Sequence, residues 1–140
     1  MEGELVAMET KYMSIALANT ILTRYPNPDD IPYWRCCYVQ GYVLSGFEKL
    51  SAYTGDPGYF DYVRKFVDQH VTEEGDIRDF RGNSMDDMMA GRTIVDVYEK
   101  TGEKKYRLAA DRIRESSNDY PRNVGSVLWA TTIVEKPTQS

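Results

Sequence analysis

Histidine and cysteine, the residues that most often bind metals or act as nucleophiles, are scarce in this 140-residue chain. The two cysteines are neighbours, Cys36 and Cys37, and adjacent cysteines form only a badly strained mutual disulfide. A structural zinc site requires four ligands, and a single histidine is available to join the pair. We therefore interpret both cysteines as small packing residues, with coordination of a soft metal as the alternative.

Several catalytic signatures are missing as well. The chain has no Gly-rich phosphate loop, no Cys-x-x-Cys, no Ser-centred nucleophile elbow and no His-Glu-x-x-His, so neither a nucleotide enzyme nor a metal enzyme is indicated. Its 17 basic residues are spread among 22 acidic ones, for a net charge of -5. Binding to phosphates needs clustered Lys and Arg, and a nucleic-acid partner is therefore not expected.

Long apolar runs are also lacking. No segment approaches the roughly 20 apolar residues that span a bilayer, and the acidic start, with Glu2 and Glu4, differs from the basic start of a signal peptide. These features predict a soluble, cytoplasmic protein with no membrane partner.

A repeated turn is the most informative feature that is present. The Thr-Gly-acid turn of residues 54–59 recurs at residues 101–106, 47 positions later, and Tyr25-Pro26 recurs as Tyr120-Pro121, 95 positions later. After each turn the apolar residues have helical spacing: Tyr59, Tyr62, Val63 and Phe66, then Tyr106, Ala109, Ala110 and Ile113. A fixed period of this size is typical of repeat architectures. The sequence therefore predicts an all-α fold of stacked helical hairpins.

Helix boundaries follow from caps and prolines. We expect helices over about 5–24, 38–54, 58–71, 84–100 and 103–117, with Gly55 as a left-handed cap. The first helix has an apolar stripe of Leu5, Met8, Tyr12, Ile15, Ala18 and Leu22. Residues 1–122 then form the hairpin repeats and residues 123–140 an irregular tail. An open terminal hairpin exposes apolar surface, which predicts that another chain or further residues cover it, with self-association as one possibility.

Two adjacent carboxylates, Asp86 and Asp87, lie where the predicted fourth helix starts. A loop at such a place can point one acid into a cleft, where it acts as a catalytic acid or base. The alternative is that both acids complement the helix dipole.

Aromatic residues are concentrated in one part of the chain: Tyr25, Tyr33, Trp34, Tyr38, Tyr42 and Tyr53. Aromatic faces with hydroxyl groups stack on sugar rings, although helical bundles also use aromatic residues as core filler. His70 shares a helical face with Val63 and Phe66, which predicts a buried or helix-capping histidine.

Several short motifs, taken together, carry a family resemblance over about residues 12–123: Arg24-Tyr25-Pro26, Tyr38-Val39-Gln40-Gly41, Tyr53-Thr54-Gly55-Asp56 with Tyr59, residues 68–77, Met85-Asp86-Asp87 leading to Gly91-Arg92, Tyr98-Glu99-Lys100-Thr101-Gly102, Ala109-Ala110 and Tyr120-Pro121-Arg122. On these residues the chain resembles the N-terminal part of glycoside hydrolase family 105. Members of that family are unsaturated rhamnogalacturonyl hydrolases, related to the unsaturated glucuronyl hydrolases.

The resemblance implies a fold, an activity and a set of site residues. The fold is part of an (α/α)6 toroid of six helical hairpins, and the activity removes an unsaturated uronic sugar from pectin-derived oligosaccharides by hydrating its double bond. The substrate is a small saccharide, and the family requires no metal or organic cofactor. By the same resemblance Asp86 is catalytic, and the substrate-binding residues are Trp34, Tyr38, Gln40 and Asp87.

The sequence also departs from the family pattern. The family continues with a Gly-Gly-aromatic-Trp-His stretch, whereas Ala130 follows Trp129 here, and the Trp-Leu-Asp-Gly motif that supplies the principal general acid is absent from the 140 residues. Trp34 is also displaced from the tryptophan that usually lies near the Tyr-x-x-Gly segment. We therefore expect a truncated, inactive form of such a hydrolase. The alternative is a non-catalytic helical-repeat module that binds a saccharide or a protein.

Overall fold

The computed structural model describes residues 2–32, 38–82 and 90–120. The elements in these ranges are α1 (Glu2–Arg24), the short 3-10 helix η1 (Pro28–Asp30), α2 (Tyr38–Thr54), α3 (Pro57–His70), α5 (Ala90–Thr101) and α6 (Lys104–Asn118). Over these ranges the only β-type pairing is an isolated bridge between Val71 and Ile77. The all-α prediction is confirmed, while the predicted tail and the start of the fourth helix lie outside the described residues.

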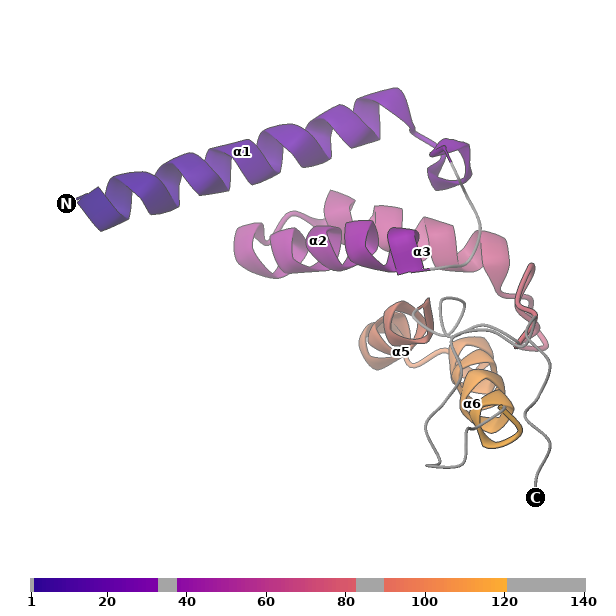
Figure 1. The fold of residues 1–140 in the computed structure, drawn as a ribbon. Helices are drawn as coiled ribbons and strands as arrows, with labels where there is room; N and C mark the ends of the chain where they lie inside the picture. Colours follow the sequence, from indigo (N-terminus) through magenta and orange to yellow (C-terminus); the bar gives the residue numbers. More distant parts are fainter. Residues whose placement is uncertain (1, 33–37, 83–89, 121–140) are drawn as a thin grey trace, which may run out of the picture.

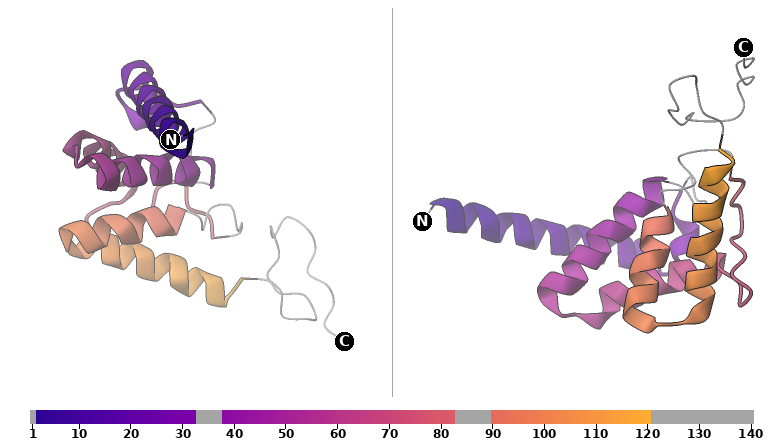
Figure 2. Two further views of the ribbon diagram at one scale, coloured as in Figure 1. Left: turned by 90° about the vertical axis from the view of Figure 1, so that its left-hand side faces the viewer. Right: turned by 90° about the horizontal axis from the view of Figure 1, so that it is seen from below.

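The helices form three tiers. Figure 1 shows α1 above a middle tier of α2 and α3, with α5 and α6 below it. The first view of Figure 2, in which α1 is seen nearly end on, shows the same order of tiers. α2 packs against α3 and α5, and α5 packs against α6. The contact between α1 and α2 is much smaller, and the N-terminal part of α1 projects beyond the other helices (Figure 2).

The repeated turn is structurally identical in its main features at both sites. Gly55 and Gly102 have φ of 71° and 69°, the left-handed region that glycine adopts without steric cost. Thr54 Oγ1 donates to the carbonyl of Leu50 at 2.7 Å, and Thr101 Oγ1 donates to that of Val97 at 2.8 Å. Each hydroxyl then accepts from the amide two residues later, at 3.1 Å and 3.3 Å. The 47-residue period thus reflects one turn used twice.

The acid that follows each turn has a different role in the two copies. Asp56 caps α3, because its Oδ1 accepts from the amide of Gly58 at 2.8 Å. Glu103 makes no side-chain cap, and its Oε1 instead accepts from Arg64 of α3 at 2.8 Å. Asp56 therefore stabilises the start of its own helix, whereas Glu103 connects the second repeat to the first.

The core lies among α2, α3, α5 and α6. The apolar residues predicted from the repeat are buried, except that Ala110 is partly buried: Tyr59, Tyr62, Val63, Phe66, Tyr106, Ala109 and Ile113. Phe47 of α2 stacks on Tyr62 with ring centroids 4.9 Å apart. These contacts confirm that the helical stripes after the two turns face one common core.

The predicted stripe of α1 is only partly correct. Ala18 is buried and Leu22 is partly buried against the core, but Tyr12 is 62% exposed. The sequence pattern gives the apolar positions of a helix, whereas burial depends on how many neighbouring helices surround it. Within the described ranges α1 has a helical neighbour on one side, which leaves much of its surface open.

Candidate functional site

The described parts of two long connections lie at one end of the bundle. The tight turns join α2 to α3 and α5 to α6, so the connections that follow α1 and α3 begin at the opposite end. Asp86, Asp87 and Trp34 belong to these connections and lie outside the described residues. Tyr38 begins α2, and its side chain is also outside the description. Gln40, in the first turn of α2, is 1% exposed.

The first long connection is fixed to α3 by hydrogen bonds. Tyr62 donates its hydroxyl to the carbonyl of Tyr25 at 2.7 Å, and Lys65 Nζ donates to that of Pro26 at 3.1 Å. Asn27 caps η1 and also accepts from Gln69 Nε2 at 2.5 Å. Because three successive residues of the connection are held, its path up to residue 32 is determined by α3.

Asp29 links this first connection to the second one. Its Oδ1 lies 2.8 Å from His70 Nε2 at the end of α3, and its Oδ2 accepts from Arg78 at 2.5 Å. His70 is 2% exposed and packs on Phe66, with ring centroids 4.4 Å apart. The prediction of a buried His70 is therefore confirmed. The hydrogen bond to Asp29 raises the pKa of Arg78, although partial burial opposes it.

The second connection is a compact turn that packs against α6. The amide of Arg78 donates to the carbonyl of His70 at 2.7 Å, and the amide of Thr72 donates to the backbone carbonyl of Asp76 at 2.9 Å. Arg112 of α6 pairs with the Asp76 carboxylate and donates to the carbonyl of Glu74 at 3.2 Å. Ile77 and Phe80 pack against the core.

The clamp formed by Asp29, His70 and Arg78 thus joins the two connections that lead to the predicted pocket residues. Residue 32 precedes the segment with Trp34, and residue 82 precedes the segment with Asp86. Sequence reasoning did not identify Asp29, since its partners are 41 and 49 positions away. The available signal was local, namely a polar Asn-Pro-Asp-Asp segment directly after the first helix.

A second cluster of ionisable groups lies between α2 and α5. Burial raises the pKa of Glu48 to about 8, and a hydrogen bond and the negative charge of Asp96 act in the same direction. The nearby cations Lys100 and Arg92 lower it only in part. Within the described residues, Oε1 of Glu48 is buried and has no hydrogen-bond partner. Burial and the neighbouring charge therefore favour a protonated Glu48 at neutral pH.

This arrangement predicts a pH-dependent stability. A glutamic acid in the unfolded chain titrates near 4.5, whereas Glu48 in the folded chain titrates near 8, so its stabilising contribution is full below the unfolded value and is lost as pH rises through the folded one. Solvent screens a partly exposed carboxyl, and we therefore expect a loss of about 1–2 kcal/mol in the free energy of unfolding between pH 5 and 9. Urea unfolding at a series of pH values measures this loss in the free energy of unfolding.

The matched variants for this prediction are Glu48→Gln and Glu99→Gln. The first keeps the shape of the protonated side chain and should flatten the pH dependence. The second changes an exposed residue of α5 and should leave the slope as it is in the wild type. A Glu48→Gln variant with the wild-type slope would show that Glu48 is ionised in the folded protein at neutral pH.

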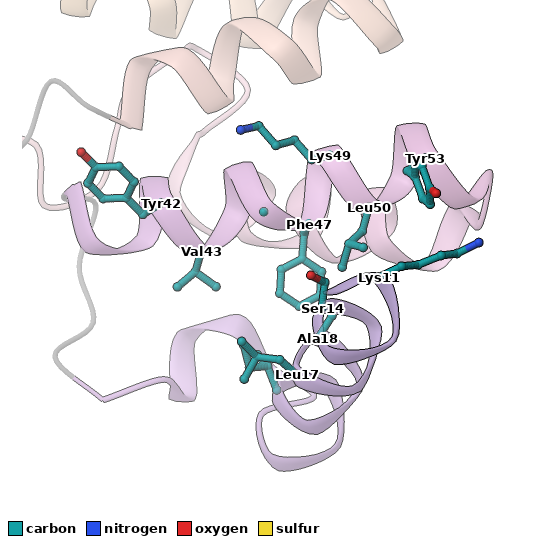
Figure 3. Close-up of a pocket in the computed structure, with 12 residues that line it drawn as sticks. Lys11, Ser14, Leu17, Ala18, Tyr42, Val43, Phe47, Lys49, Leu50 and Tyr53 are labelled. Atoms are coloured by element: carbon teal, nitrogen blue, oxygen red, sulfur yellow. The ribbon is translucent and has the colours of Figure 1, made fainter. Parts of the chain in front are cut away.

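α1 and α2 enclose a groove of about 740 Å³ on the side of α2 away from the α5 and α6 tier. Figure 3 shows Leu17 and Ala18 of α1 facing Val43, Phe47 and Leu50 of α2. Lys11 lies at one end, where its ammonium sits 5.0 Å from the centre of the Tyr53 ring. The groove is largely apolar and is separate from Asp29 and Glu48.

Neither a cluster of metal ligands nor a membrane-spanning helix is found in the described part of the chain. No group of three or more His, Cys, Asp or Glu side chains within residues 11–32, 40–82 and 91–120 is placed to hold a metal ion. No described helix is long and apolar enough to cross a membrane.

Comparisons with known proteins agree with the resemblance found in the sequence. The sequence profile of glycosyl hydrolase family 88 matches residues 13–138. A solved structure, a glycoside hydrolase from family 105 of C. acetobutylicum ATCC 824, is similar with a TM-score of 0.79 and 26% sequence identity. The similarity covers 89% of this chain and 33% of that one, so this chain spans about a third of the length of that relative.

Proposed function

Since this chain belongs to glycosyl hydrolase family 88, we propose that it forms part of the pocket of a glycosidase that removes an unsaturated uronic sugar from rhamnogalacturonan oligosaccharides. The observation that carries the proposal is the profile match over residues 13–138. That match runs through both long connections, including the segments that contain Trp34 and Asp86.

The proposed reaction hydrates the carbon-carbon double bond of the terminal sugar. An acid adds a proton to one carbon of the double bond, and water adds its oxygen to the neighbouring carbon and gives up a proton. The resulting hemiketal opens, and the rest of the saccharide is released. A carboxyl group suits this work when partial desolvation brings its pKa towards the working pH.

We assign the residues on the basis of the family motifs. Asp86 assists the proton transfers, and Asp87, Trp34, Tyr38 and Gln40 bind the sugar. The clamp at Asp29 supports this assignment, because it holds the ends of both connections at the same end of the bundle. Gln40 is buried among the described residues, which suits a residue that fixes the wall of a pocket. No resident cofactor is part of the proposal.

The 140 residues by themselves should not turn over substrate, because the Trp-Leu-Asp-Gly motif with the principal acid is not among them. The test is the ultraviolet absorbance of the conjugated double bond in an unsaturated rhamnogalacturonan disaccharide. We expect no decrease with the purified chain and a steady decrease with a full-length family 105 enzyme. A decrease with this chain that disappears in Asp86→Asn would contradict the expected inactivity and support the role of Asp86.

One observation favours a second candidate, a non-catalytic module that binds a saccharide. This chain spans about a third of the solved relative and would present only one side of a pocket. A chimera separates the two candidates, with residues 13–120 of this chain replacing the matching third of the C. acetobutylicum protein. The hydrolase proposal predicts turnover that depends on Asp86, whereas a module predicts sugar binding without turnover.

A further inference from the structure

Arg78 differs from the other two members of the clamp because it can be replaced without leaving a buried group unpaired. Its side chain is 52% exposed, whereas that of Asp29 is 21% exposed. Without Arg78, Asp29 would still have His70 at 2.8 Å. An ion pair with this exposure adds little to the free energy of unfolding. The contact between Arg78 and Asp29 therefore matters chiefly for the segments that it joins.

The first connection gives Arg78 a fixed partner. Side chains of α3 hold residues 25–27 by hydrogen bonds, and η1 follows directly with Asp29 as its second residue. His70, at the end of α3, contacts the other oxygen of the Asp29 carboxylate. None of these contacts involves Arg78. The carboxylate of Asp29 is thus held by α3 and η1, whatever the position of the second connection.

The second connection is held at Arg78 through both backbone and side chain. The Arg78 amide donates to the carbonyl of His70 at 2.7 Å, and Nη2 lies 2.5 Å from Oδ2 of Asp29. The next residue, Asp79, has φ of 64° and is the one non-glycine residue with a positive φ in the described ranges. Such a conformation persists where the surrounding contacts fix it, and Oδ2 of Asp79 lies 3.7 Å from Nε of Arg78. The path of the chain after Arg78 therefore depends on where the Arg78 side chain is held.

We propose that Arg78 is a positioning residue, which holds the second connection in a fixed relation to the first through Asp29, and that sugar binding depends on this relation. The inference rests on the proposed function, in which Trp34, five positions after Asp29, and Asp86, eight positions after Arg78, serve one sugar. Groups from two segments that act on one ligand must keep their relative positions, and a misplacement of about 1 Å can cost about a hundredfold in rate.

Amide hydrogen exchange of the purified chain tests the link between the connections without any sugar. Asp29→Asn keeps the shape of the side chain and removes its charge, so the amides of Arg78 and Phe80 should exchange about fivefold faster, although they lie far along the chain from the change. Arg107→Met, which removes an exposed arginine that pairs with Asp111 within α6, should leave these amides as in the wild type.

An NMR titration with an unsaturated rhamnogalacturonan disaccharide tests the dependence of binding on Arg78. Arg78→Met should weaken binding about tenfold and lower the urea midpoint of unfolding by less than about 0.5 M. Arg78→Lys should bind within about threefold of the wild type, because one nitrogen of Arg78 contacts Asp29 and an ammonium group can supply one donor. Arg107→Met should bind as the wild type does. A loss of affinity without a loss of stability separates positioning from a structural role.

The outcomes distinguish this proposal from the proposed function. Wild-type affinity in a folded Arg78→Met variant overturns the positioning role and leaves the proposed function standing. A wild-type chain that binds no sugar contradicts the proposed function, and the exchange comparison then decides whether Asp29 and Arg78 join the two connections. Unchanged exchange at Arg78 and Phe80 in Asp29→Asn would overturn that link. An Arg78→Met variant that does not fold would show a structural role and overturn the proposal as well.

Discussion

Replacing Asp29 by alanine is expected to lower the free energy of unfolding by about 2–4 kcal/mol, measured by urea unfolding. Asp29 accepts from two groups on different elements, His70 at 2.8 Å and Arg78 at 2.5 Å. His70 is almost fully buried, and a buried polar group that loses its partner keeps the desolvation cost without compensation. The variant also disconnects the two long connections from each other.

Two further variants define the origin of this effect. Asp29→Asn keeps an acceptor oxygen but loses the negative charge, so its cost should be roughly half that of Asp29→Ala. Asp111→Ala removes a carboxylate that pairs with Arg107 and Arg114 on the exposed surface of α6, and such pairs contribute less than about 1 kcal/mol. If Asp29→Ala costs no more than Asp111→Ala, the clamp does not hold the connections.

Gly75→Ala is expected to destabilise the protein by about 2–5 kcal/mol, measured in the same way. Gly75 has φ of 80°, and a non-glycine residue in the left-handed region costs about 1–2 kcal/mol. A Cβ there would also lie 3.0 Å from the Ala109 amide nitrogen and 3.1 Å from the Leu108 carbonyl carbon. Backbone atoms of a packed helix cannot move aside easily, so overpacking adds about 1–3 kcal/mol.

Gly55→Ala is the matched control for the steric part of this cost. Gly55 has a similar φ of 71°, but a Cβ there would meet no atom within 4 Å. Gly55→Ala should therefore show the conformational cost alone, about 1–2 kcal/mol. Equal costs for the two variants would mean that the turn of residues 71–82 does not pack closely on α6.

The repeat was predictable from the sequence because it depends on local interactions. A threonine that bonds back to the helix and a glycine in the left-handed region define each turn within a few residues. The apolar positions after each turn keep helical spacing, and this is enough to predict which face of α3 and α6 is buried. The helix ends of α2 and α3 also follow from local caps, Gly55 and Asp56.

The features that the sequence did not reveal depend on contacts between distant residues. The raised pKa of Glu48 results from its burial and the nearness of Asp96, which is 48 positions away on another helix. The exposure of Tyr12 depends on the absence of a neighbouring helix on that side of α1 among the described residues. The spacing of apolar residues cannot distinguish a buried core position from an exposed apolar position.

The assignment of Asp86, Asp87, Trp34 and Tyr38 to the sugar site stays a prediction from the family motifs, since these side chains lie outside the described residues. Gln40 is described and buried, and its role in sugar binding is equally a prediction. The structure contributes the described residues on either side of these segments, namely the connections joined by Asp29 and the packing of α2 against α5.

The most direct test of the account is an NMR titration of the purified chain with an unsaturated rhamnogalacturonan disaccharide, followed through backbone amide shifts. We predict saturable changes at the starts of α2 and α5, near Gln40 and Gly91, with little change at Leu17 and Tyr53 in the groove. Asp86→Asn should weaken the response, while the exposed control Glu99→Gln should not. An absence of shifts at millimolar sugar, or shifts confined to the groove, would contradict the claim that this end of the bundle belongs to a saccharide pocket.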